Sequence, residues 1–153
     1  MKRGIKVKGM EQWEAKLEQV EKDLGRHGEV GEALVDATML VARTAKQLAP
    51  VDLGDLRADI QPDVRKVRSG LEGVVGNIKK HAPFMEEGTE PHWPPLAALE
   101  VWARRHGTTA WVVCRAIGTR GNKAIKYLER GLTNNTAKIY LLLGRAVSAL
   151  VRK

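Results

Sequence analysis

The residue types best suited to chemistry gather in one stretch, "KKHAPFMEEGTEPHWPP" (79–95), which holds two of the four histidines, three glutamates and four of the six prolines. Adjacent carboxylates such as Glu86 and Glu87 could serve the acid–base chemistry of a glycosidase or nuclease. Neighbouring side chains on a turn point apart, however, and the sequence supplies no nucleophile nearby. We expect no catalytic residues, and hydrolysis through Glu86 or Glu87 stays an alternative.

Metal coordination is a second chemistry to test against the sequence. His81, His92, His106 and Cys114 offer nitrogen and sulfur ligands, but their spacings of 11, 14 and 8 match no compact ligand pattern. The single cysteine lies among apolar residues and is best interpreted as a small core residue. No P-loop, G-x-S-x-G or H-E-x-x-H motif occurs. We therefore expect neither a metal nor another cofactor.

Docking is a third interpretation of the 79–95 stretch. Its prolines restrict the backbone, which lowers the entropy cost of presenting Phe84, Met85 and Trp93. Large apolar side chains on a stiffened connection suit either a plug for the core or a hot spot at an interface. The sequence leaves both roles open.

Apolar spacing predicts the helices that precede this stretch. Apolar residues at intervals of three and four predict one helix over 10–24, and the glycines of "GRHG" (25–28) end it. The same periodicity predicts a second helix from about residue 30 to Ala49, because Pro50 disfavours helical geometry in the residue before it. Residues 4–8 alternate apolar and basic side chains, which predicts a short strand.

A hairpin should follow the second helix. Asp52 and Asp55 are spaced for a capping box. Strands are predicted over 63–68 and 71–77, with the turn at Ser69 and Gly70. Two glycines in the second strand would allow another group to approach closely; they are Gly73 and Gly76. Further helices are predicted over about 95–106, 109–117, 123–132 and 136–151. We predict one α+β domain over 1–153, in which helices pack on a small antiparallel sheet.

The charge of +8 and the pI near 9.8 favour an anionic partner, although the basic residues are scattered except in the first eight positions. Residues 98–123 resemble a helix-turn-helix, so a basic DNA-binding module is the main alternative function. The second helix there opens with Trp111, Val112 and Val113, which suit burial or a subunit contact better than base recognition. No apolar run reaches the length of a membrane span, and the lone cysteine favours synthesis in a reducing cytoplasm.

Three segments resemble the head–tail joining or tail-completion (neck) proteins of long-tailed phages, relatives of the lambda tail protein Z. The segments are "AKQLAPVDLGDLRADI" (45–60), "HAPFMEEGTEPHWPP" (81–95) and "GTRGNKAIKYLERGL" (118–132). The first carries a V-D-x-G-x-L-R pattern and the second an A-P-aromatic-x-E-x-G-T pattern. The third matches less closely, with Ala124, Ile125 and Tyr127 where a proline–phenylalanine pair is frequent. Residues 95–118 look like a helical insertion carried by longer members.

The resemblance implies a structural virion protein and not an enzyme. Such proteins form rings, commonly of six copies, between the tail and the neck of the head. The implied partners are further copies of the chain, a tail terminator or tube, a head-closure ring, and genomic DNA in the lumen without sequence preference. The matched residues become candidate structural or interface positions: Pro50, Asp52, Gly54, Leu56, Arg57, Pro83, Phe84, Glu87, Gly88, Thr89 and Trp93.

Overall fold

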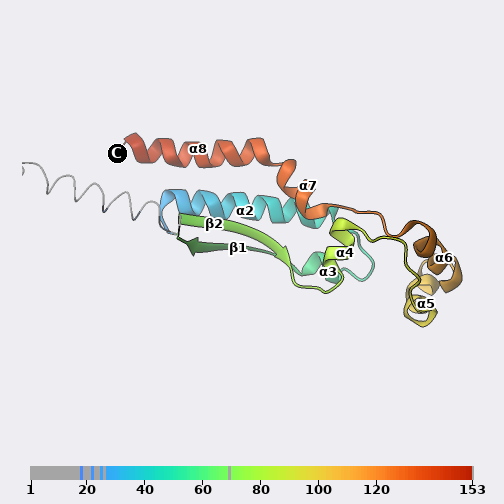
Figure 1. Ribbon diagram of the computed structural model, residues 1–153. Coiled ribbons are helices and arrows are strands. Elements are labelled where there is room, and N and C mark those ends of the chain that lie inside the picture. The colour runs from blue at the N-terminus through green and yellow to red at the C-terminus, as the bar shows by residue number, and fades with distance from the viewer. Residues whose placement is uncertain (1–17, 19–21, 23–24, 26, 69, 153) are drawn as a thin grey trace, which may run out of the picture.

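The structure is a computed structural model, and it describes residues 18, 22, 25, 27–68 and 70–152. Within these residues, seven helices accompany one two-stranded antiparallel sheet, which confirms the predicted α+β class (Figure 1). The elements are α2 (Glu29–Leu48), α3 (Asp55–Ala58), β1 (Ile60–Val67), β2 (Gly70–Asn77), α4 (Ala82–Glu87), α5 (Leu96–Arg105), α6 (Ala110–Arg120), α7 (Tyr127–Thr133) and α8 (Thr136–Arg152). The predicted strand over 4–8 lies outside the described residues. Of the predicted helix over 10–24, Glu18 and Lys22 are described, and both are helical.

Helix α2 is the central element, because α8 lies along one side of it and the hairpin along another (Figure 1). It ends at Ala49 as predicted, and the amide of Ala49 still donates to the carbonyl of Ala45 at 2.8 Å. Its buried residues are mostly small, which lets neighbouring elements approach the helix on several faces. They are Gly31, Ala37, Thr38, Val41, Ala42 and Ala45.

The hairpin begins earlier and turns earlier than predicted. β1 starts at Ile60, which is fully buried and pairs with Asn77. The register pairs Val67 with Gly70, so the turn falls between these two residues. A two-stranded hairpin is marginal by itself, and this one is stabilised by packing on α2.

The two glycines of β2 differ in their surroundings. A side chain at Gly73 would collide with the Thr38 hydroxyl of α2, so glycine permits the close contact there, as predicted. At Gly76 an added Cβ would have no other group of the described residues within 4 Å, so no close approach within the chain depends on glycine there.

The prediction that 81–95 is a connection without regular structure is wrong for its first part. Residues 82–87 form α4, with Pro83 in the first turn, where a missing amide hydrogen costs no hydrogen bond. The predicted helix after Pro95 is confirmed as α5, and the helix after Thr109 is confirmed as α6 but extends to Arg120. α5 and α6 pack on each other and project from one end of the molecule (Figure 1).

Candidate assembly surfaces

The three segments that carry the family resemblance meet around one side chain, Tyr127. This residue is fully buried at the start of α7. The core around it takes residues from α2, α3, β1 and α4, so that each segment contributes at least one member. The cluster consists of Ala42, Ala45, Ala49, Leu56, Ile60, Ala82 and Tyr127. Leu56, predicted as a motif residue, therefore acts in packing.

Glu86 of α4 caps α7 across space. Its carboxylate accepts hydrogen bonds from the backbone amides of Leu128 at 3.0 Å and Glu129 at 2.9 Å. The residue before α7, Lys126, has a left-handed backbone (φ 55°) and supplies no capping side chain. A carboxylate at a helix N-terminus satisfies free amides and suits the helix dipole. This placement explains Glu86 without catalysis, and its neighbour Glu87 is exposed.

Two adjacent backbone segments connect this core to the α5–α6 unit. Thr89 and Asn122 form an antiparallel bridge, in which each amide donates to the other residue's carbonyl, at 3.0 and 3.2 Å. Gly88 has φ 79°, and a Cβ there would lie 2.5 Å from the carbonyl oxygen of Asn122. A side chain at Gly121 would collide with the carbonyl of Thr89. Gly88 and Thr89 of the second segment thus form the base of the α5–α6 unit.

Asp52 links the first segment to the end of α5. The prediction that it caps a helix is wrong, because α3 begins after Gly54, a left-handed residue (φ 89°), and has no side-chain cap. Instead the Asp52 carboxylate pairs with the Arg105 guanidinium and lies 3.8 Å from Nε2 of His106. The His106 ring in turn stacks on Trp102 with 3.9 Å between centroids. Sequence spacing held no sign of this contact, since 53 residues separate Asp52 from Arg105.

The α5–α6 unit exposes large apolar side chains. Three of the four tryptophans are described, and all three lie in or beside this unit: Trp93 is 62%, Trp102 39% and Trp111 58% exposed. Phe84 of α4 is also exposed, whereas Met85 packs against the core. The 79–95 stretch therefore has both predicted roles, as core packing and as exposed apolar surface. Exposed aromatic clusters of this kind mark protein interaction sites.

The proline-rich residues hold Trp93 against α6 despite its exposure. The Trp93 ring lies where a side chain at Gly118 would be, so only glycine leaves room for it. The buried thiol of Cys114 donates to the Pro94 carbonyl at 3.4 Å. Cys114 is buried, as predicted for a small core residue.

The helix-turn-helix interpretation of residues 98–123 correctly predicts a helix pair, but its second helix presents an apolar first turn. Trp111 and Val112 are more than half exposed there. Base recognition requires polar or basic side chains at these positions. The exposed surface of the unit suits a protein contact better.

Metal binding has little support in the geometry of the described residues. Among the described residues, no group of three histidine, cysteine, aspartate or glutamate side chains could hold a metal ion. Of the four residues considered as ligands, His81 and His106 border one pocket, where the His106 ring stacks on Trp102, and Cys114 lies beside Pro94. No helix in the described part of the chain is long and apolar enough to span a membrane.

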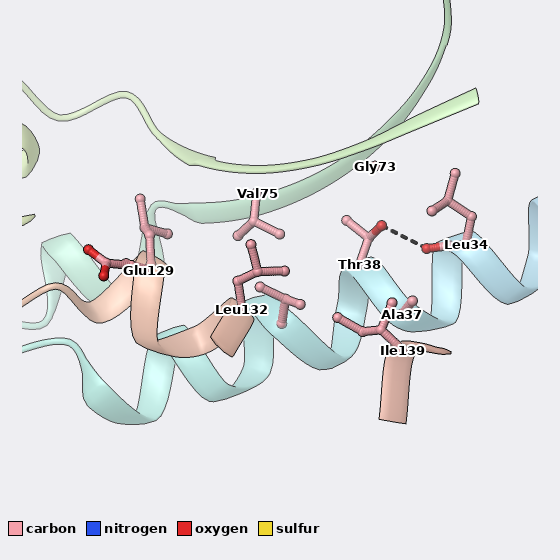
Figure 2. A pocket seen from close by; sticks show the side chains of 10 residues that line it. Leu34, Ala37, Thr38, Gly73, Val75, Glu129, Leu132 and Ile139 are labelled. Carbon is pink, nitrogen blue, oxygen red and sulfur yellow. Dashed lines mark hydrogen bonds between the residues drawn. The ribbon is translucent and has the colours of Figure 1, made fainter. Parts of the chain in front are cut away.

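An apolar pocket of about 330 Å³ lies where α2, β2, α7 and the start of α8 meet (Figure 2). The Thr38 hydroxyl donates to the Leu34 carbonyl at 2.7 Å and so has its hydrogen bond within α2. Leu132 lines the pocket and is half exposed. Glu129 supplies the one carboxylate of the lining. The pocket suits an apolar side chain, because its lining is mostly apolar and carries a single carboxylate.

The motif residues take different positions in the structure. Leu56 is buried, and Gly88 and Thr89 form the base of the α5–α6 unit. Another three border a second pocket, of about 420 Å³, beside Trp102: Pro50, Asp52 and Gly54. The remaining candidates are exposed: Arg57, Pro83, Phe84, Glu87 and Trp93.

Sequence reasoning missed the exposed side of α8. None of its 17 residues is buried, and Tyr140, Leu141, Val147 and Val151 are 46–80% exposed. The signal was present in the sequence, because α8 carries more apolar residues than one helical face can hold.

These features define a small α+β protein whose polar chemistry serves packing and capping and whose large apolar side chains remain at the surface. A family model described as "Bacteriophage HK97-gp10, putative tail-component" matches residues 11–88, about half of the chain. The chain belongs to this HK97-gp10-like family of bacteriophage tail components. No curated protein and no solved structure matches it. The α5–α6 unit, α7 and α8 all lie beyond the matched residues.

Proposed function

We propose that this chain is a structural virion protein that forms a ring at the head–tail junction, where it completes the tail and joins it to the head. Membership of the HK97-gp10-like family identifies the chain as a phage tail component. The placement in a ring at the head–tail junction rests on the resemblance of the motifs to neck and tail-completion proteins, among them relatives of the lambda tail protein Z. By that resemblance the ring holds six copies, and its partners are a tail tube or terminator and a head-closure ring.

The observation that carries this proposal is the exposure of apolar side chains on two separate surfaces. One is the projecting α5–α6 unit with its three tryptophans, and the other is the outer side of α8 (Figure 1). A subunit of such a ring needs separate surfaces, because it contacts neighbouring copies within the ring and other components above and below it.

The positive charge fits the same proposal. A net charge of +8 would attract an acidic partner ring, and basic residues facing the lumen would contact DNA phosphates without reading sequence. Catalysis has no part in the proposal, since Glu86, the better placed of the two adjacent carboxylates, caps α7.

Native mass spectrometry of the purified chain, with and without a short DNA duplex, tests the proposal. A discrete ring-sized oligomer that ignores the duplex is the expected result, and negative-stain images should show a closed ring. A monomer or dimer that binds duplex would instead support the DNA-binding module at residues 98–123. A monomer that ignores DNA, and that also fails to form rings with added tail-tube and head-closure proteins, would overturn the ring.

A further inference from the structure

Helix α8 carries two apolar rows, and one of them has no cover among the described residues. The row toward α2 is partly buried and consists of Ile139, Leu142, Leu143, Ala146 and Leu150. The second row, here called the α8 seam, is exposed throughout: Ala137, Tyr140, Gly144, Val147 and Val151. Its spacing of 3, 4, 3 and 4 is the pattern with which one helix packs on another in a coiled coil. Tyr140 and Val151 are 73% and 80% exposed.

The chain contains a second row with the same spacing. Apolar residues of the predicted helix over 10–24 form it, and it is here called the N-terminal seam: Met10, Trp13, Leu17, Val20 and Leu24. These five residues lie outside the described part of the chain. Glu18 and Lys22, which are described, are helical and form an exposed i,i+4 ion pair at 3.5 Å. Both belong to the polar side of the predicted helix.

The charges beside the two seams are complementary. A basic residue directly follows every second position of the α8 seam: Lys138, Arg145 and Arg152. Glutamates occupy the equivalent flank of the N-terminal seam: Glu11, Glu14, Glu18 and Glu21. Residues 10–24 carry five acidic and two basic side chains, although the whole chain is strongly basic. Opposite charges along matching flanks favour one pairing and orientation over others.

We propose that the N-terminal seam of one copy packs antiparallel on the α8 seam of a neighbouring copy. The charged rows lie on the same flank of their seams, so they face each other only when the two helices run in opposite directions. In this alignment Met10 lies near Val151, Leu17 near Gly144 and Leu24 near Ala137. The large Leu17 then faces the one seam position without a side chain.

The orientation distinguishes a neighbouring copy from the same chain. α8 runs antiparallel to α2 (Figure 1). If residues 10–24 folded back over the four-residue "GRHG" connection, they would also run antiparallel to α2 and therefore parallel to α8. That alignment would place the glutamates on the flank away from the basic row. The charge pattern thus favours a second copy.

This contact deepens the proposed ring and rests on it for its biological setting. It joins two different surfaces, so each copy offers one seam to each neighbour, and a closed ring results if the rotation per copy closes. The α5–α6 unit would remain free for other components.

Disulfide trapping between single-cysteine variants tests the contact directly. In a Cys114→Ala background, Met10→Cys protein is mixed with Val151→Cys protein under mild oxidation. A mixed disulfide dimer is expected from this pair and not from Met10→Cys with Ala137→Cys, which would form in the parallel alignment. Ala149→Cys, exposed on the same helix but off the seam, serves as the matched control. Equal yields from all three pairs would overturn the proposal.

Charge reversal separates this contact from the ring itself. Changing Lys138, Arg145 and Arg152 to glutamate should raise the concentration needed for assembly about tenfold, because three weak ion pairs become repulsive together. Adding Glu11→Lys, Glu14→Lys and Glu21→Lys should restore assembly, because in the proposed alignment these glutamates lie opposite the three reversed positions. A ring that ignores the reversal and gives no mixed disulfide would overturn the contact while the ring stands. A seam disulfide without closed rings would support the contact and contradict the proposed ring.

Discussion

The carboxylate of Glu86 lies 3.0 Å from the backbone nitrogen of Leu128, although 42 residues separate them in the chain. The same carboxylate also accepts a hydrogen bond from the backbone amide of Glu129. The backbone amide of Lys126 donates to the Glu86 carbonyl at 3.1 Å. These bonds fix the start of α7 on α4. Since α7 begins with Tyr127, they also hold the central core side chain in place.

Removal of this cap should destabilise the protein measurably. We expect Glu86→Ala to lower the free energy of unfolding by about 1–2 kcal/mol, because two helix amides lose a charged acceptor. Urea titration followed by circular dichroism measures the change. Glu87→Ala is the matched control, since the Glu87 side chain is exposed and makes no hydrogen bond or ion pair with the described residues. Equal losses in both variants would show that the cap contributes nothing.

The buried hydroxyl of Tyr127 should make stability fall at alkaline pH. Burial raises the pKa of Tyr127, the Glu86 carboxylate raises it further, and the Asn77 side chain acts in the opposite direction. The folded state therefore favours the protonated phenol, so this contribution to stability is complete below the ordinary pKa near 10 and is lost as pH rises through the raised value. Unfolding by urea between pH 8 and 11 should show the decline. Tyr127→Phe should flatten it, while Tyr140→Phe, on the exposed seam, should not.

Two helical glycines should respond oppositely to alanine. At Gly131, a Cβ would lie 3.1 Å from both the Ala45 methyl and the Val41 carbonyl of α2. We expect Gly131→Ala to cost about 1–3 kcal/mol through overpacking between α7 and α2. At Gly144 of α8 nothing lies within 4 Å, so Gly144→Ala should stabilise the helix by up to about 1 kcal/mol. Thermal unfolding of both variants checks the pair, and a shift of the same sign in both would contradict this account.

Local sequence rules predicted the elements that depend on local causes. Pro50 fixes the end of α2, and the turn signal at Ser69 and Gly70 predicts the hairpin, because both causes act within a few residues. The start of β1 was missed because Ile60 is placed by burial in a core shared with Tyr127, which lies far along the chain. α4 was missed because a high proline content suggested an irregular connection, whereas proline is well suited to a first helical turn.

The candidate site was predictable in composition but not in arrangement. The sequence correctly marks the 79–95 stretch, and its aromatic side chains are exposed, as expected for a hot spot at an interface. The roles of Glu86 and Asp52 were not predictable, because each acts on a partner more than 40 residues away. Contacts of that length follow from the packing of α4 and α5 and leave no periodic signal in the sequence.

The ion pair between Asp52 and Arg105 should control local opening of the α5–α6 unit more than global stability. Both side chains are about one-third exposed, so the pair contributes under about 1 kcal/mol to unfolding. Asp52→Asn should nevertheless increase amide hydrogen exchange at the end of α5, because Arg105 and His106 lose their shared carboxylate. Exchange mass spectrometry of peptides covering residues 100–109 measures this effect.

Charge inversion makes that test specific to the pair. Asp52→Arg should increase exchange near Arg105 as much as Asp52→Asn does, and adding Arg105→Asp should return it toward the wild-type level, since the inverted pair again brings opposite charges together. Asp63→Asn, exposed on β1, is the control and should leave residues 100–109 unchanged. High salt should weaken the wild-type protection because the pair is partly solvated. If exchange stays at the wild-type level in Asp52→Asn, the stacking of His106 on Trp102 and the backbone bonds at Thr89 hold the α5–α6 unit without help from this pair.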